Sequence, residues 1–292
     1  MAATSTSSVS GAARAATARG QDDTLAPKTL DSALTTARSF LQFCADIEAV
    51  PEDLYTKVPL PTLSDADEVS DSSLESDRVP PIMEYLYRYE YTSRDHVVWL
   101  LIWHTGAPIG ALRGLDLQDL NLDGSKPHVE YVHRPETGTP LKNDDLSERV
   151  NRINDRMAKA IEDYIDGPRW ETKDNHGRKP LLTTQYGRAS AGCLRDAVYR
   201  WTRPCVINLD CPVEDKDPET CEHLEHDHMS GCPAVRSPHD VRKARVTKYR
   251  NDGVPRGVVS DRLDASEQIL DKHYDRASKH EKADRRWRLI QE

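Results

Sequence analysis

The spacing of apolar residues predicts a chain that is mostly α-helical. Residues 28–50 repeat apolar side chains every three or four positions, as an amphipathic helix does. Residues 97–103 are apolar without interruption, so a helix here should be buried on all sides. Ser93 is suited to cap the start of this helix and Gly106 to end it. Asn154 can cap a later helix in the same way.

Alternating apolar and polar residues predict a small antiparallel sheet. Residues 128–134 alternate in this way, and residues 135–140 are rich in turn-forming residues. Residues 147–153 can return as the second strand, and residues 181–184 can form another short strand. The predicted fold class is therefore α+β, mainly helical with a small antiparallel sheet.

Composition divides the chain into three parts. Residues 1–26 begin with an Ala-, Ser- and Thr-rich stretch that is expected to be a flexible tail, with a transit peptide as the alternative. Residues 27–72 hold one helix and a Ser- and Asp-rich linker. Residues 73–292 are expected to form the principal domain, with a Cys-rich insertion at residues 205–232.

Charge is distributed unevenly along the chain. The net charge is −9 and the pI about 5.7, a poor overall match to nucleic acid. From Arg236 to Glu292, however, 15 Lys and Arg stand against 10 Asp and Glu. This asymmetry predicts a basic face on an acidic body. The acidic excess also resembles proteins of halophilic archaea. Because no apolar run is long enough to cross a membrane, we expect a cytoplasmic protein with no membrane partner.

Four cysteines are crowded into the predicted insertion. Cys205, Cys211, Cys221 and Cys232 lie within 28 residues, and three histidines lie between the last two cysteines. Such a set suits a structural Zn²⁺ in a segment with few apolar residues. The spacing differs from that of a standard zinc finger, which has a Cys-x2-Cys pair. Free thiols and disulfides are the alternatives.

A His and an Arg stand three residues apart at a predicted helix start. Pro238 suits the first turn, so His239 and Arg242 should share one face and can clamp a phosphate at the positive end of the helix. Tyr274 follows about 32 residues downstream, in a helical segment that Ser266 can cap.

These residues together resemble the tyrosine recombinase, or phage integrase, family. The family has a His-x-x-Arg helix, a Gly-Val-Pro-like turn, matched here by Gly253-Val254-Pro255, and then a nucleophilic Tyr. Upstream, residues 104–120 resemble its Thr-Gly-x-Arg segment. The resemblance covers roughly residues 73–289 and implies that residues 73–292 are an integrase-type catalytic domain. Residues 27–72 would then be a partial core-binding segment, about half of the helical domain that the family carries before its catalytic domain. The resemblance is closest to archaeal, halophile-type integrase-like proteins, which share the Asp-Lys-His-Tyr-Asp run of residues 271–275.

The resemblance implies cleavage and rejoining of double-stranded DNA without a nucleotide cofactor. Tyr274 would be the nucleophile that forms a 3′-phosphotyrosyl intermediate, and Arg242 the second arginine that binds the scissile phosphate. His239 would be its general acid/base companion, and Lys142 is the best match to the family's hairpin lysine. A homo-oligomer on DNA is implied as well. We expect these four side chains to face one groove.

Two departures from the family pattern put catalysis in question. Pro108 stands where the family has its first catalytic arginine, and Leu263-Asp264-Ala265 stands where it has Leu-Gly-His. Either Arg113 or Arg134 could supply the missing charge. The alternative function is a non-catalytic DNA-binding relic or regulator with the recombinase fold. A third hypothesis is a zinc-stabilised interaction protein.

Overall fold

A computed structural model describes residues 25–64, 72, 74–213, 220–270 and 278–290. Almost all of the predicted flexible tail lies outside these residues, and so does Tyr274. The chain divides into two compact units, residues 1–70 and residues 71–292. Each unit is described by itself below.

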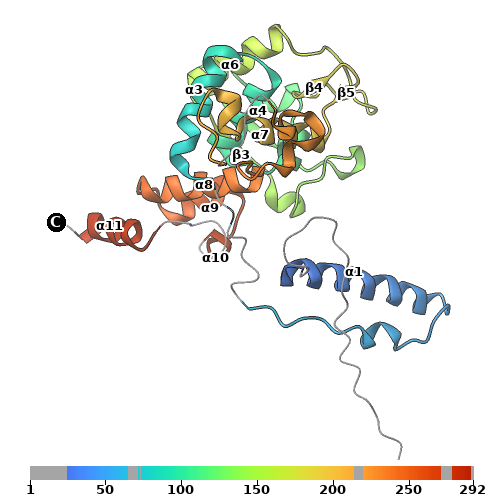
Figure 1. The fold of residues 1–292 in the computed structure, drawn as a ribbon. Coiled ribbons are helices and arrows are strands. Elements are labelled where there is room, and N and C mark those ends of the chain that lie inside the picture. Colours follow the sequence, from blue (N-terminus) through green and yellow to red (C-terminus); the bar gives the residue numbers. More distant parts are fainter. Residues whose placement is uncertain (1–24, 65–71, 73, 214–219, 271–277, 291–292) are drawn as a thin grey trace, which may run out of the picture. The chain divides into compact units, whose positions relative to one another are not determined.

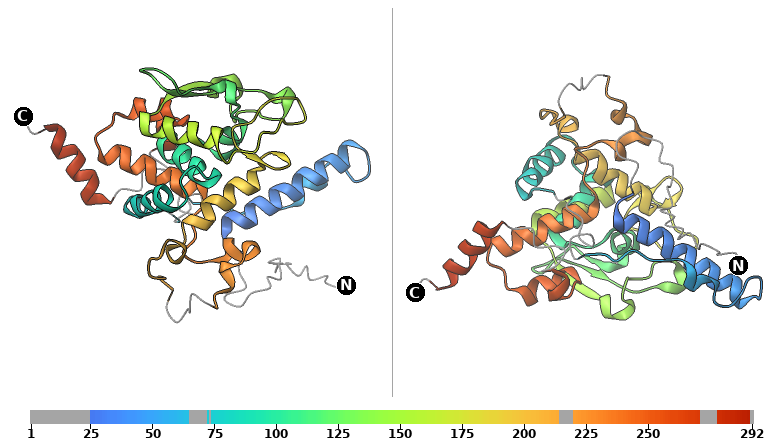
Figure 2. Two further views of the ribbon diagram at one scale, coloured as in Figure 1. Left: turned by 90° about the horizontal axis from the view of Figure 1, so that it is seen from above. Right: turned by 60° about the horizontal axis from the view of Figure 1, so that its bottom comes forward.

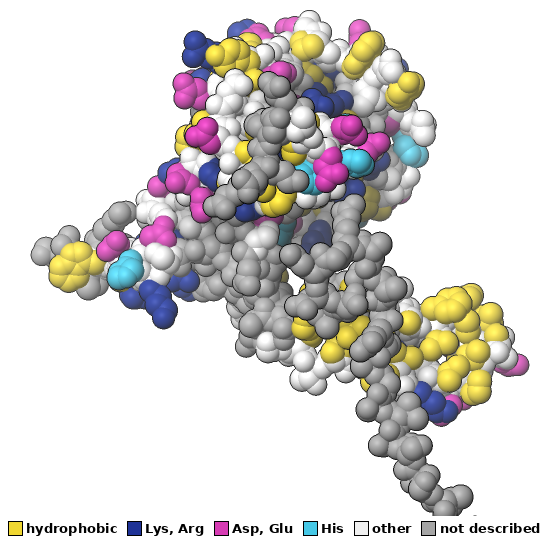
Figure 3. All heavy atoms as spheres, in the orientation of Figure 1, with side chains coloured by type: hydrophobic (Ala, Val, Ile, Leu, Met, Phe, Trp, Pro, Cys, Tyr) yellow, Lys and Arg dark blue, Asp and Glu magenta, His cyan; other side chains and the backbone are white. Residues whose placement is uncertain are grey.

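The first unit contains one long helix and one short 3-10 helix. Helix α1 runs from Pro27 to Asp46, with Pro27 in its first turn, and η1 spans Leu54–Lys57. The predicted helix over residues 28–50 is thus confirmed, although it ends four residues early. None of the residues of α1 is buried, and Phe40 and Phe43 are among its exposed apolar side chains. Figure 3 shows apolar side chains gathered on this unit.

The second unit is built around helix α4, Arg94–Thr105. Residues 97–103 are all buried, as their uninterrupted apolar sequence predicted. The helices named below pack against α4, and Figure 1 shows most of them around it. Figure 2 gives two further views. These helices are α3 (Val79–Tyr89), α5 (Ile109–Gly114), α6 (Asp155–Asp166), α7 (Ala191–Trp201) and α8 (Pro238–Asn251). The core of the unit therefore lies along α4.

Three helices lie in the described residues that follow α8. Helices α9 (Arg256–Leu263) and α10 (Glu267–Ile269) follow α8, and α11 (Lys279–Ile290) packs against α8. A small separate apolar cluster, which includes Val246 of α8 and Leu263 of α9, packs these two helices together.

The sheets are small and antiparallel. Strands β1 (Leu120–Asn121), β2 (His128–Tyr131) and β3 (Arg149–Arg152) pair in the order β1-β2-β3. Strand β4 (Thr183–Thr184) pairs with β5 (Gly187–Arg188). The predicted strands are confirmed but shorter, and the two-residue strands β1 and β5 had no alternating pattern to reveal them. The expected fold class, mainly helical with a small antiparallel sheet, is confirmed.

Helix caps lie at the predicted positions. The side chains of Ser93 and Asn154 accept hydrogen bonds from backbone N–H groups at the starts of α4 and α6. Ser266 does the same for α10. Gly106 ends α4 with φ +64°, in the left-handed region that favours glycine.

An ion network holds the β2–β3 hairpin to the helical core. Arg134 of the hairpin pairs with Asp119 at 2.5 Å and with Asp116 at 3.4 Å. Arg188 of β5 binds Asp116 at 2.5 Å and Asp174 at 2.7 Å. Because both Asp116 and Asp119 are buried, each needs its arginine partner.

Substitution of Gly106 by Ala should destabilise the fold. A Cβ at this position would lie 2.6 Å from Cγ of Leu263, in a backbone conformation that alanine resists. We expect a loss of about 2–5 kcal/mol in the free energy of unfolding, measured by denaturant titration. Gly110→Ala is the matched control, because nothing lies within 4 Å of its added Cβ. An equal loss in both variants would contradict the close approach of Leu263.

Stability should fall as the pH drops from about 6.5 to about 4. Burial, and then the charge of Arg156, lowers the pKa of His96 to about 4. Between these pH values the imidazole of His96 is protonated in the unfolded chain but neutral in the folded chain. Acidification therefore favours unfolding by up to about 3 kcal/mol. Denaturant titrations of wild type and His96→Phe should show a shallower pH slope for the variant below pH 6.5. The two slopes should agree above pH 7, and equal slopes below pH 6.5 would refute the prediction.

Candidate functional site

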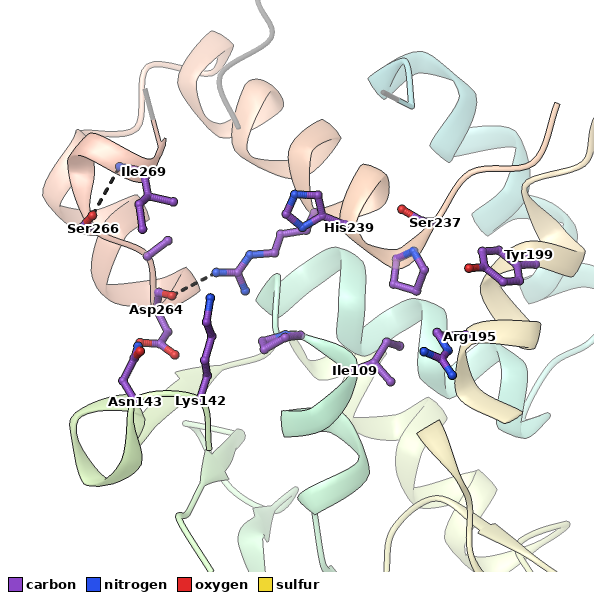
Figure 4. A pocket seen from close by; sticks show the side chains of 14 residues that line it. Ile109, Lys142, Asn143, Arg195, Tyr199, Ser237, His239, Asp264, Ser266 and Ile269 are labelled. Atoms are coloured by element: carbon purple, nitrogen blue, oxygen red, sulfur yellow. Dashed lines mark hydrogen bonds between the residues drawn. The ribbon is translucent and has the colours of Figure 1, made fainter. Parts of the chain in front are cut away.

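A pocket of about 640 Å³ lies where α5, α7, α8 and the hairpin loop meet (Figure 4). It brings together three of the four residues predicted from the sequence, Lys142, His239 and Arg242, with Pro108 beside them. The fourth, Tyr274, lies outside the described residues. The lining residues are Pro108, Ile109, Lys142, Asn143, Arg195, Tyr199, Ser237, Pro238, His239, Arg242, Asp264, Ala265, Ser266 and Ile269.

The start of helix α8 presents His239 and Arg242 to the pocket. Ser237 and Asp240 form a reciprocal capping box, in which each side chain accepts a hydrogen bond from the backbone N–H of the other. Pro238 occupies the first turn, as predicted. His239 is exposed whereas Arg242 is buried. The local sequence thus fixes the helix start from which both side chains extend.

Arg242 joins three segments around the pocket. One terminal nitrogen donates a hydrogen bond to the carbonyl oxygen of Gly106, at the end of α4. The other donates to the carbonyl oxygens of Leu263 and of Asp264, the latter at 3.1 Å. The guanidinium therefore has a structural role in addition to lining the pocket.

Lys142 from the hairpin loop and Asp264 from the end of α9 both line the pocket (Figure 4). Lys142 is exposed on the loop before η5 (Asp144–Ser147). Asp264 has φ +54° and ends α9 at the position where the family has glycine. Its carboxylate accepts a hydrogen bond from Ser147 at 2.6 Å and lies 3.6 Å from the guanidinium of Arg149.

Neither arginine considered as a substitute at Pro108 reaches the pocket. Arg134 is held in the buried ion network with Asp119 and Asp116. Arg113 donates a hydrogen bond to the carbonyl oxygen of Gly138 at 2.9 Å and does not line the pocket. Pro108 itself caps α5 and does line it.

Arg195 is a pocket residue that the sequence analysis missed. It extends from α7 next to Ile109, and it is exposed (Figure 4). Among the described residues, no hydrogen bond or ion pair engages its guanidinium. The spacing of Arg195 and Tyr199 places both on one face of α7, but nothing in the sequence showed which face meets α8.

The balance of charge in the pocket favours an anionic ligand. Lys142, Arg195 and Arg242 are cations, and His239 adds a positive charge when protonated. Asp264 is the one carboxylate among the lining residues, and Arg149 lies next to it. A phosphate diester would thus meet several cations and one largely neutralised acid.

Comparison with known proteins identifies the fold. No protein-family model matches the chain, and no curated protein matches its sequence. The XerA recombinase structure has a TM-score of 0.51 and 14% identity, covering 92% of this chain and 86% of that chain. The Tn1549 transposon integrase, solved with a circular intermediate DNA, has a TM-score of 0.54 and 16% identity, covering 91% and 80%. The XerH recombinase, bound to a palindromic difH substrate, has a TM-score of 0.53 and 14% identity, covering 90% and 73%.

The chain has the fold of the tyrosine recombinases. At these identities the similarity concerns the fold alone. Within this tyrosine recombinase fold, the pocket lies at the start of α8 and carries a proline at the end of the Thr-Gly-Ala-Pro segment. No helix in the described part of the chain is both long and apolar enough to span a membrane.

The four clustered cysteines lie outside this pocket. Cys205, Cys211, Cys221 and Cys232 line a separate cavity of about 20 Å³, together with His223. No group of three or more Cys, His, Asp or Glu side chains in the described ranges is arranged to hold a metal ion as it stands. All four cysteines have free thiols.

Substitution of Arg134 should destabilise the protein much more than substitution of Arg195. Arg134→Met leaves the buried carboxylate of Asp119 without its closest partner, so we expect a loss of about 3 kcal/mol in the free energy of unfolding. Arg195→Met removes an exposed cation and should change it by less than about 0.5 kcal/mol. Denaturant titration of both variants measures these changes. An Arg134→Met protein as stable as the wild type would contradict the structural role of Arg134 and leave it available for a role in the pocket.

Proposed function

We propose that the chain cleaves and rejoins double-stranded DNA in site-specific recombination or integration. The observation that carries this proposal is one cationic pocket that gathers Lys142, His239 and Arg242 from distant segments of a tyrosine recombinase fold. These are the residue types that strand exchange through a tyrosine requires, and they come from the positions that resemble the family's motifs.

The proposed reaction conserves the phosphodiester bond energy. The hydroxyl oxygen of Tyr274 attacks the scissile phosphorus, and its proton passes to His239. The bond from phosphorus to the 5′ oxygen breaks, which leaves a 3′-phosphotyrosyl link. Lys142 donates a proton to the leaving 5′ oxygen. Arg242 and the other pocket cations stabilise the charge on the transition state. Reversal of these steps with a new 5′-hydroxyl rejoins the strand.

Pro108 makes this a weakened site. Proline cannot donate a hydrogen bond or carry charge, and loss of one donor to a developing anion costs on the order of 10²–10³ in rate. Among the described cations that line the pocket, Arg195 is engaged by no other described group, so it is the residue best placed to offset part of this loss. A non-catalytic DNA-binding protein is the second candidate function, and Pro108 is the observation that favours it.

The biological setting is also a proposal. The residue 271–275 run and the acidic composition support a halophile-type archaeal integrase acting in the cytoplasm. Strand exchange needs two cleaved DNA sites, so the protein would act on DNA as a homo-oligomer.

Restoring arginine at position 108 should increase formation of the covalent adduct. Pro108→Arg should raise the rate of adduct formation on nicked duplexes by about 10², because a transition-state donor is regained. The duplexes carry a randomised sequence around the nick, so that no target site needs to be known. The adduct is detected as a protease-sensitive protein–DNA species that survives denaturation, and peptide mapping should locate it at Tyr274.

Three control variants assign the roles. Tyr274→Phe in the Pro108→Arg background should abolish the adduct. Arg195→Met in the wild type should lower its rate, whereas Arg88→Met, a substitution on α3 outside the pocket, should not. Equal rates for wild type and Pro108→Arg would show that Pro108 does not limit catalysis. Tight DNA binding without any adduct in either protein would favour the non-catalytic candidate.

A further inference from the structure

The insertion between α7 and α8 encloses its own small cavity. Cys205, Cys211, Cys221 and Cys232 all line this space of about 20 Å³, although the first and the last of them are 27 positions apart in the sequence. A space of this size has room for one water molecule or one ion. The fold thus places four cysteine side chains around one small space.

A cation lies beside the four thiols. Arg203, two residues before Cys205, lines the same small cavity as Cys205, Cys211, Cys221 and Cys232. The cysteines and Arg203 are therefore neighbours in space and not isolated side chains.

Arg203 is a buried cation that no described carboxylate neutralises. Only 3% of the residue is exposed, and its described hydrogen bonds run to the carbonyl oxygens of Arg200 and His223. A buried charge of this kind is costly unless an anion lies nearby. The partly buried arginines of the ion network, in contrast, pair with aspartates. The side chains beside Arg203 are instead the cysteines.

We propose that Cys205, Cys211, Cys221 and Cys232 bind one Zn²⁺ as thiolates, with Arg203 offsetting the charge of the complex. Zinc with four thiolates carries a net charge of −2, which supplies the anion that Arg203 lacks. Four sulfur ligands select zinc over the harder cations, and four bonds of about 2.3 Å would close the cavity. Because the thiols are not yet arranged for a metal, binding requires them to turn toward the space that they line.

Zinc would give the insertion the interior that its sequence does not provide. Met229 is one of the few buried apolar side chains between Asn208 and Ala234. At the base of the insertion, Thr202 exchanges hydrogen bonds with Arg236, the residue before the Ser237 cap. The site would therefore be structural, and this inference does not depend on the proposed DNA cleavage.

Zinc content and thiol protection of the full-length wild-type protein provide the first test. Protein purified without chelator under reducing conditions should contain one zinc per chain by elemental analysis. Iodoacetamide should then modify the four clustered cysteines slowly, and adding a strong zinc chelator should expose all four together. Peptide mapping assigns the modified residues. Since only wild-type protein is used, a variant that fails to fold cannot confuse this result.

Matched substitutions provide the second test. Cys221→Ser should lower the zinc content several-fold, whereas Cys193→Ser, on α7 and outside the cavity, should retain one zinc per chain. Arg203→Met should weaken zinc affinity by about 10–100-fold, as loss of a charge partner beside a metal site does. An unchanged affinity in Arg203→Met would overturn the role assigned to Arg203.

Two results would overturn the metal site itself. One is wild-type protein that holds no stoichiometric zinc even after incubation with excess Zn²⁺ and whose four thiols react at the rate of a denatured control. The other is a pair of disulfides among the four cysteines in protein purified without reductant, with no zinc taken up after reduction.

Discussion

The hydrogen bonds of Arg242 set the geometry of the pocket. Its guanidinium links the end of α4, at Gly106, to the turn after α9, at Leu263 and Asp264. Both of these turns have left-handed backbone conformations, which place their carbonyl oxygens where a buried cation can reach them. Arg242 thus helps to join the core to the C-terminal helices, together with Arg262, which donates hydrogen bonds to the carbonyl oxygen of His104. The pocket lies beside this connection.

The same arginine is also a candidate ligand for phosphate, so structure and chemistry share one group. A phosphate that binds in the pocket would compete with, or add to, the carbonyl oxygens that now accept hydrogen bonds from Arg242. The position of Arg242 is therefore set by groups of the protein itself, whereas Pro108 contributes no charge to the pocket. Arg195 adds an exposed cation to the same pocket.

From local signals in the sequence, the helices and strands could be predicted more accurately than the contacts between them. The apolar run at residues 97–103, the caps at Ser93 and Asn154, and the Ser237–Pro238 helix start all correspond to observed structure. The strands were predicted to be longer than they are. Their lengths depend on pairing with residues far along the chain, which the local sequence does not show. Lys142, His239 and Arg242 do meet in one pocket, but Arg195 could not be found, because its place depends on how α7 packs against α5 and α8.

The hydrogen bonds between Thr202 and Arg236 have a consequence for how the chain tolerates change. They join the two ends of the Cys-rich insertion directly. The end of α7 and the start of α8 therefore stay close in space, whatever the number of residues in the segment between them. The entropy cost of closing a loop rises only slowly with its length. Residues can therefore be gained or lost within the insertion during evolution while α8 keeps its register on α4, and with it the position of His239.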